Sequence, residues 1–265
     1  MLPDPPAPAD ATGRAFDLLN ARFDKILVVT LERAKDRQER LRERLCGLNY
    51  ELFFGTDKRN LDVADLQARK VYDEARARRL HRHGKPMVLG MIACALSHRG
   101  AYEAVLANGW QRVLIFEDDV VPDPAALPQL SAALDELPPS WELLYLGYTR
   151  HEQITPALRR KQWTYLQLAR LRLIRWSPTE ARHMLPRPYS AHLRRAGLHD
   201  CLHAYAVTAS AARKLVAAQT PVALNPDPAV SRLVMRGELE AFITEPRFFD
   251  QERFFDPADP SLVHG

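Results

Sequence analysis

Cysteine is scarce in this chain of 265 residues. The three cysteines, Cys46, Cys94 and Cys201, stand far apart, and no Cys-x-x-Cys pair occurs. Neither a disulfide framework nor a zinc site is therefore expected. We interpret the cysteines as reduced thiols of a cytosolic protein, with Cys94 packed in the core.

Long apolar runs and a basic tail are also missing. No apolar run reaches the about 18 residues that a membrane span requires. Residues 1–11 are proline-rich and acidic, unlike a signal peptide, and predict a partly disordered lead-in over 1–24. Because the net charge is only +4 and no zinc-finger or RNA-recognition signature occurs, nucleic acid is not expected as a partner. We expect a cytoplasmic protein.

What the sequence does contain is an alternation of short apolar runs with helical patterns. Strands are predicted over 25–31, 51–55, 113–116, 142–147, 203–208 and 239–244. Helices are predicted over 32–48, 90–106, 122–137, 209–218 and 230–237. This order predicts one α/β domain over residues 25–250, with a mostly parallel central sheet flanked by helices.

Three segments are expected to lie outside this regular pattern. The charged stretch 58–86 is interpreted as a surface loop with a partial helix, and 221–228 as a proline-rich loop. The last residues, 246–265, are expected to wrap over the surface, with 251–265 as a tail beyond the domain.

A basic insert is predicted at about 150–198. Between residues 150 and 195 the sequence holds eleven Lys and Arg residues against two Glu, interleaved with leucines and tryptophans. Such asymmetry points to an anionic contact on one side of the protein. Two interpretations stay open: the segment packs its leucines on the core, or it makes a peripheral contact with the inner membrane face.

An acidic triplet follows the apolar run of residues 113–116. Glu117, Asp118 and Asp119 are consecutive, and adjacent carboxylates repel by about 1 kcal/mol at 4 Å even in water. A cation would relieve this repulsion, and hard oxygen ligands suit Mg²⁺ or Mn²⁺. A metal at the carboxyl end of a strand in an α/β sheet could hold a diphosphate. The alternative is a solvated acidic turn.

Three segments, in this order, resemble glycosyltransferase family 25. Residues 28–33 (V-V-T-L-E-R) are similar to the family's V-I-N-L-x-R, with Thr30 in place of Asn. Residues 90–98 (G-M-I-A-C-A-L-S-H) are close to G-E-I-G-C-A-L-S-H, and residues 114–119 (L-I-F-E-D-D) to L-I-L-E-D-D. Family 25 contains lipooligosaccharide galactosyl- and glucosyltransferases and is related to the collagen galactosyltransferases.

Weaker matches extend the resemblance over roughly residues 25–250, with the basic insert poorly covered. Thr56-Asp57 falls where the family has V-D-G, and residues 141–147 resemble W-D-x-x-x-L-G. Residues 203–215 resemble the late H-A-Y-L-I-S…A-R-R-L segment, and Asp227 falls near a late P-x-D. Each motif alone is weak, whereas several in the same order are a strong match.

The resemblance implies a GT-A-like fold, a UDP-sugar donor, and Mn²⁺ or Mg²⁺ as cofactor. It implies inverting transfer of galactose or glucose to a saccharide or glycolipid acceptor, in the synthesis of lipopolysaccharide or another surface polysaccharide. Glu117 and Asp119 would hold the metal, with Asp119 acting in catalysis and Asp118 in donor binding.

Inverting transfer also needs a general base on the acceptor side. Asp227 is the candidate, as a late carboxylate in a loop, and Asp200 and Glu238 are its alternatives. Asp227 between two prolines is also a common turn residue.

Further donor-binding residues are implied more weakly. Arg33 and Asp57 would line the nucleoside pocket at the ends of the first two strands, although Asp57 also suits a strand-end turn. Ser97 and His98 would contact the donor or its phosphates, although His98 is equally compatible with a buried structural histidine.

Some positions depart from the family pattern. Met91 stands where the family has Glu, and Ala93 and Lys58 stand where it has Gly. A second function is therefore an altered or inactive nucleotide-sugar-binding module that recruits partners through its basic face.

Overall fold

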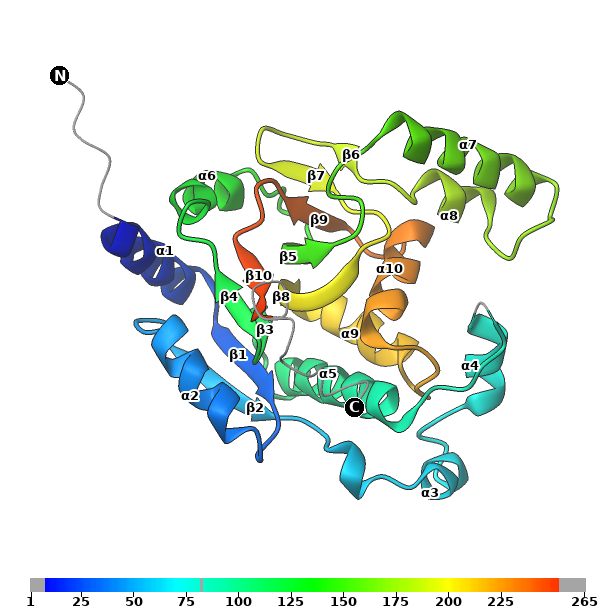
Figure 1. Cartoon of the computed structure of the whole chain (residues 1–265), viewed down its shortest axis with the longest axis horizontal. Helices are drawn as coiled ribbons and strands as arrows, with labels where there is room; N and C mark the ends of the chain where they lie inside the picture. Colours follow the sequence, from blue (N-terminus) through cyan, green and yellow to red (C-terminus); the bar gives the residue numbers. More distant parts are fainter. Residues whose placement is uncertain (1–7, 82, 253–265) are drawn as a thin grey trace.

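The computed structural model describes residues 8–81 and 83–252, which are arranged around one central sheet (Figure 1). This sheet has eight strands in the order β2–β1–β3–β8–β5–β9–β7–β6. Its strands are β1 (Lys25–Thr30), β2 (Tyr50–Phe54), β3 (Arg112–Glu117), β5 (Leu143–Thr149), β6 (Arg187–Pro188), β7 (Leu193–Arg195), β8 (Asp200–Thr208) and β9 (Ala241–Thr244). A second sheet pairs β4 (Val120–Pro122) with β10 (Phe249–Gln251).

Helices cover both faces of the sheet, so the predicted α/β domain is confirmed (Figure 1). The α-helices are α1 (Pro8–Arg22), α2 (Lys35–Arg44), α3 (Val63–Ala68), α4 (Glu74–Leu80), α5 (Leu89–Ala107), α6 (Leu130–Asp135), α7 (Pro156–Arg170), α8 (Pro178–Arg182), α9 (Ala209–Ala218) and α10 (Pro226–Arg236). The 3₁₀ helices are η1 (Lys58–Asn60) and η2 (Leu127–Gln129).

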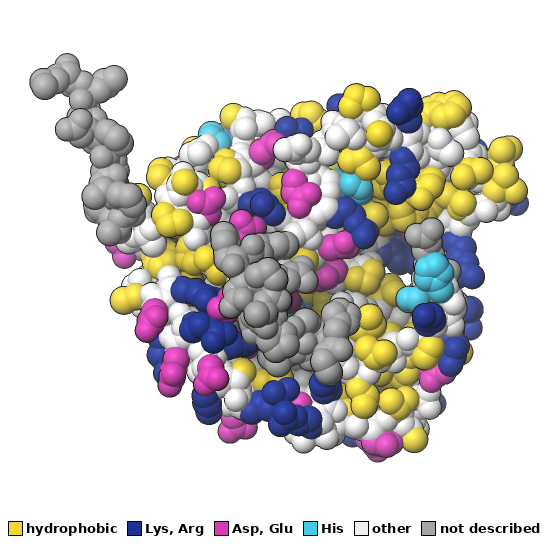
Figure 2. All heavy atoms as spheres, in the orientation of Figure 1, with side chains coloured by type: hydrophobic (Ala, Val, Ile, Leu, Met, Phe, Trp, Pro, Cys, Tyr) yellow, Lys and Arg dark blue, Asp and Glu magenta, His cyan; other side chains and the backbone are white. Residues whose placement is uncertain are grey.

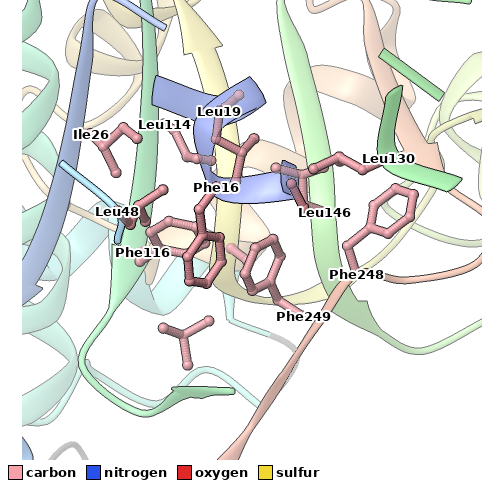
Figure 3. Packing of buried hydrophobic residues seen from close by; sticks show 14 of the residues in the cluster. Phe16, Leu19, Ile26, Leu48, Leu114, Phe116, Leu130, Leu146, Phe248 and Phe249 are labelled. Atoms are coloured by element: carbon pink, nitrogen blue, oxygen red, sulfur yellow. The ribbon is translucent and has the colours of Figure 1, made fainter. Parts of the chain in front are cut away.

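Alternating side chains on each strand build two hydrophobic cores. On β3, Leu114 and Phe116 join the core under α1, α2 and α6, whereas Val113 and Ile115 join the core under α5, α9 and α10. Figure 3 shows Phe16 of α1 reaching toward the sheet in the first of these cores. Because both faces are buried, the strands read as continuous apolar runs rather than as alternating ones.

The direction of the strands decides where a site can form. β1 runs parallel to β2 and β3, and β5 runs parallel to β9. β8 runs antiparallel to both β3 and β5, so the sheet is mixed. The carboxyl ends of β1, β2 and β3 therefore lie together at one edge, where α/β proteins commonly bind ligands.

Both ends of the domain are more ordered than the sequence predicts. Most of the expected lead-in forms α1, whose Phe16 and Leu19 are buried under the sheet, and residues 1–7 lie outside the described part. Near the other end, Phe248 and Phe249 are buried in the same core instead of wrapping over the surface. Of the predicted tail, residues 253–265 lie outside the described part.

Two interior segments also differ from prediction. The stretch 58–86 contains η1, α3 and α4 rather than a loop with one partial helix, since Asp62 and Asp73 each cap a helix with a side-chain carboxylate. The helix expected over 122–137 is shorter, because residues 120–122 pair as β4 and regular α-helix begins at Leu130.

The basic insert forms an arm of two helices, α7 and α8, at one side of the molecule (Figure 1). Leu158, Tyr165 and Trp176 pack on a small cluster with Met184 and Met235. Other apolar side chains of the insert stay exposed, so only some of them pack as the core interpretation requires. In the described part of the chain, none of the helices has the length and hydropathy of a membrane span.

Candidate active site

The acidic triplet lies at the carboxyl end of β3, in the turn that leads into β4. Because β4 pairs with β10, Gln251 comes to this turn from more than a hundred residues away. The Gln251 side-chain amide lies 3.3 Å from an Asp119 carboxylate oxygen and 3.4 Å from a Glu117 oxygen. Glu117 and Asp119 thus share one amide, as two carboxylates facing the same small space would.

Asp118 has a different environment from its neighbours. The Thr30 hydroxyl donates to one of its oxygens at 2.7 Å, and the Arg37 guanidinium donates to the other at 2.9 Å. Asp118 is buried, and burial raises the pKa of its carboxyl in spite of Arg37. Asp118 thus braces the turn through one hydrogen bond to each of its oxygens, and its donor-binding role stays a prediction.

The closeness of the three carboxylates changes the pKa of Asp119. Burial, followed by the negative charges of Glu117 and Asp118, raises the pKa of its carboxyl to about 7. A carboxyl that titrates near neutrality at the end of a strand is typical of a functional site.

His98 joins the site from α5. Its ring is buried, with Nε2 lying 3.1 Å from a Glu117 oxygen and Nδ1 lying 2.8 Å from the Tyr205 hydroxyl. The Tyr205 hydroxyl in turn donates to the hydroxyl of Tyr102 at 2.9 Å. This chain of contacts fixes the ring, so His98 positions Glu117 from a buried place, as a structural histidine would, and its contact with the donor stays a prediction.

Asp227 also belongs to this cluster. It lies in the first turn of α10 rather than in the predicted loop, because Pro226 begins the helix. Burial and the charge of Glu117 raise the pKa of its carboxyl to about 6, against the lowering effect of the hydrogen bond from the Cys201 backbone N–H. Of the alternative bases, Asp200 pairs with Arg150 at 2.9 Å, whereas Glu238 is an exposed residue beyond the end of α10.

The structure corrects the interpretation of Cys94. Its side chain is partly exposed, and its sulfur lies within 4.8 Å of one ligand atom each of His98 and Glu117. Burial and the charges of Glu117 and Asp227 raise the pKa of the thiol well above its usual value. Cys94 therefore lines the acidic site instead of packing in the core.

The remaining predicted donor residues lie at the same edge of the sheet, beyond β1 and β2. Arg33 and Asp57 form an ion pair at 2.5 Å, and the Arg59 backbone N–H with this guanidinium holds the pKa of Asp57 below its usual value. Ser97 is buried, and its hydroxyl donates to the Ala93 carbonyl and accepts from the Thr56 backbone N–H. Ser97 joins α5 to the end of β2, and its contact with the donor stays a prediction.

Sequence reasoning missed three contributors to the site. Gln251 could not be found, since no local pattern marks a residue that arrives by strand pairing. Arg37 lies on the helix predicted over 32–48, where no motif marked it, yet Arg37, Arg40 and Arg44 all pair with buried or half-buried carboxylates. The spacing of Cys94 and His98, four residues apart on a helix, was a signal that could have linked them.

The residues of the turn fit a hard divalent cation. Glu117 and Asp119 offer carboxylate oxygens, which Mg²⁺ and Mn²⁺ prefer as ligands. The Gln251 amide faces these carboxylates with its NH₂ group, so it would have to turn over to bring its oxygen to a cation held there. The buried Gln251 Oε1 atom has no hydrogen-bond partner within residues 8–81 and 83–252. A cation between Glu117 and Asp119 would neutralise the repulsion between the two carboxylates, and it would satisfy this oxygen once the Gln251 amide had turned over.

The fold and the site define the class of protein: an α/β protein with a buried carboxylate site at the carboxyl ends of parallel strands. The family described as "Glycosyltransferase family 25 (LPS biosynthesis protein)" matches residues 23–230 of the chain. The chain belongs to glycosyltransferase family 25, which confirms the family that the motifs predict.

Named relatives include both active and inactive proteins. The chain is 29% identical over 147 residues to the human "Inactive glycosyltransferase 25 family member 3" and 28% identical over 139 residues to human "Procollagen galactosyltransferase 2". These alignments cover 51% of this chain but 23% and 22% of the relatives, so the chain matches less than a quarter of their length. Mouse xyloside xylosyltransferase 1 in its apo form aligns with a TM-score of 0.34 and 16% identity, over 89% of this chain and 72% of that one.

Proposed function

We propose that this protein is a metal-dependent inverting glycosyltransferase that moves galactose or glucose from a UDP-sugar to a saccharide or lipid-linked acceptor. The observation that carries the proposal is the grouping of Glu117, Asp119 and Asp227 in one partly buried site at the carboxyl edge of the sheet. Family membership supplies the reaction class, and these three carboxylates supply the chemistry that it needs.

Glu117 and Asp119, with the Gln251 amide oxygen, would hold Mn²⁺ or Mg²⁺. When bound, the cation neutralises the charge that develops on the leaving diphosphate. The protein's own part is to keep these oxygens in place: Asp118 anchors the turn to Thr30 and Arg37, and His98 holds Glu117.

Asp227 would accept the proton of the acceptor hydroxyl. A carboxyl with a pKa of about 6 is mainly ionised at neutral pH and is a better proton acceptor than an ordinary aspartate. Its place on α10 differs from that of the metal-holding turn on β3, so the base and the cation can act on different sides of the sugar.

The Arg33–Asp57 pair is proposed to line the nucleoside part of the donor site. It lies past the ends of β1 and β2, next to the strand that ends in Glu117. Asp57 has a lowered pKa and stays ionised, so it could accept hydrogen bonds from ribose or base.

The arm of α7 and α8 is proposed to bring the protein to an anionic membrane face on the cytoplasmic side, where a lipid-linked acceptor would lie. Trp163, Leu171 and Leu173 are each more than 60% exposed. Figure 2 shows hydrophobic and basic side chains next to one another over the region of this arm. Exposed apolar side chains among arginines are what a bilayer surface with anionic lipids attracts.

Vesicle binding tests this membrane contact. The protein should co-float with vesicles of anionic phospholipid and not with neutral ones, and the triple change of Trp163, Leu171 and Leu173 to Ser should abolish co-flotation. Equal binding of the triple variant and the unchanged protein would overturn the contact.

The activity itself is tested by incubating the purified chain with Mn²⁺ and a panel of UDP-sugars, and measuring release of UDP. Asp119→Asn should abolish release, and Asp135→Asn, which alters an exposed carboxylate, should not. If no UDP-sugar binds or reacts in the presence of Mn²⁺, the proposed transferase activity is refuted.

A second function, an inactive nucleotide-sugar-binding module, is favoured by one observation. The chain is about as similar to relatives named inactive as to those named galactosyltransferases, and Met91 stands where the family motif has Glu. Calorimetry separates the two functions, since a module of this kind would bind a UDP-sugar without releasing UDP.

A further inference from the structure

Two residues of α5 face the acidic turn together. Cys94 and His98 are four residues apart, so they lie on one face of the helix, and Glu117 of β3 meets them there. The Cys94 sulfur, one His98 ring nitrogen and one Glu117 oxygen all lie within 4.8 Å of one another. A thiol, an imidazole and a carboxylate thus converge at one point.

We propose that Cys94, His98 and Glu117 form a zinc site, distinct in ligand chemistry from the hard-cation site at Glu117 and Asp119. Sulfur, imidazole nitrogen and carboxylate oxygen are the three ligand types that Zn²⁺ uses, and three protein ligands leave a fourth position open. Bond lengths of about 2.0–2.3 Å in a tetrahedral site put the ligand atoms roughly 3.3–3.8 Å apart. The observed upper limit of 4.8 Å therefore requires only a small contraction.

The contacts of the His98 ring place it between the core and the acidic turn. The Tyr205 hydroxyl donates to Tyr102, and its oxygen lies 2.8 Å from the His98 Nδ1 atom. The other ring nitrogen, Nε2, faces a Glu117 oxygen 3.1 Å away. A zinc ion bound to Cys94 would take this nitrogen and this oxygen as its further ligands.

The surroundings of His98 match those of a metal-binding histidine. Such a histidine usually donates its second ring N–H to an outer partner, which sets the orientation of the ring. Tyr205 provides that partner, and its own hydroxyl is held by Tyr102 inside the core. The ring is thus already aimed at the place where Zn²⁺ would bind, and little reorganisation is needed.

Glu117 is a ligand of both proposed metal sites, so the two sites compete for it. Glu117 cannot orient fully toward both cations, so Zn²⁺ at Cys94 and His98 would compete with Mn²⁺ or Mg²⁺ at Asp119. Zn²⁺ would then inhibit sugar transfer. This consequence rests on the proposed function, whereas zinc binding itself rests only on Cys94, His98 and Glu117.

Cobalt spectroscopy tests the site without any turnover. Titration of the reduced full chain with Co²⁺ should produce the near-ultraviolet sulfur-to-metal charge-transfer band of a thiolate ligand, and Zn²⁺, which binds such sites more tightly, should remove it. Cys94→Ser should abolish the band, whereas Cys46→Ser, which alters an exposed cysteine, should keep it. Absence of the band in the unchanged chain, or its persistence in Cys94→Ser, would overturn the site.

A conservative variant tests the role of the outer partner. Tyr205→Phe removes the acceptor of the His98 Nδ1–H and should weaken Zn²⁺ affinity by about 10- to 100-fold, measured by competition with a chromophoric chelator. Circular dichroism of each variant shows whether it folds. An unchanged affinity in folded Tyr205→Phe would contradict the arrangement, whereas a missing transferase activity with an intact cobalt band would contradict only the proposed function.

Discussion

Removal of the Asp119 charge should stabilise the fold while it abolishes the activity. Asp119→Asn keeps the shape of the side chain but cannot ionise. The pKa of this carboxyl is raised from 3.8 to about 7 in the folded protein, because burial and the charges of Glu117 and Asp118 disfavour the ionised form. Each pKa unit corresponds to about 1.4 kcal/mol, so the ionised Asp119 destabilises the fold by up to about 4 kcal/mol.

The sign of this effect sets its dependence on pH. A carboxyl with a raised pKa favours the fold while it is protonated, that is, below its unfolded pKa, and this advantage is lost as the pH rises through the folded pKa of about 7. Asp119→Asn should therefore match the unchanged protein near pH 4. Its stability relative to that protein should grow between about pH 4 and pH 7 and then level off.

Urea denaturation at several pH values between 4 and 9 measures this difference. Asp135→Asn alters a carboxylate with 67% of its side chain exposed and serves as the matched control, with no comparable pH-dependent gain. Saturating Mn²⁺ should stabilise the unchanged protein more than the Asn variant, because only the former keeps both carboxylate ligands. A variant with the same stability difference at pH 4 and pH 9 would refute the reasoning.

Three further changes test the surroundings of the site. Arg37→Met leaves a buried carboxylate without its cation and should cost about 3–5 kcal/mol of unfolding free energy; a loss below 1 kcal/mol, the range of Arg69→Met in an exposed ion pair, would contradict a bracing role. Asp227→Asn should lower kcat by about 10²- to 10⁴-fold with UDP-sugar binding retained, and the activity of the unchanged protein should rise with pH through about 6, where Asp227 ionises; a full rate in the variant would exclude it as the base. Gly147→Ala would place a Cβ 2.2 Å from a His203 nitrogen and 2.6 Å from a backbone oxygen, so thermal unfolding should show a loss of about 1–3 kcal/mol.

Much of the architecture could be predicted because it depends on local sequence patterns. The runs that became β1, β3, β5 and β8 are buried on both faces, so their apolar character is continuous and easy to read. The order of these runs with intervening helices was enough to predict an α/β domain.

The antiparallel direction of β8 was not predictable in the same way. The direction of β8 depends on the path of the insert that precedes it, and no residue of the strand itself determines that direction. α1 was missed for a related reason: its proline-rich start suggests disorder, and only contact with the sheet buries Phe16 and Leu19.

The site shows the same difference between what local patterns predict and what long-range contacts decide. Glu117 and Asp119 could be identified from their position after an apolar run, and the family motifs pointed to Asp227 and His98. What a motif cannot say is which way each side chain turns. Asp118 and Ser97 belong to the same motifs, yet one pairs with Arg37 and the other with backbone groups.

The pairing of β4 with β10 has a consequence for how the site comes into being. Gln251 reaches Glu117 and Asp119 only through this pairing, and the Glu252 backbone N–H donates to the Asp119 carbonyl at 2.8 Å. During synthesis the acidic turn emerges from the ribosome more than a hundred residues before its last partner. The proposed cation site therefore stays incomplete in the nascent chain until translation passes residue 251.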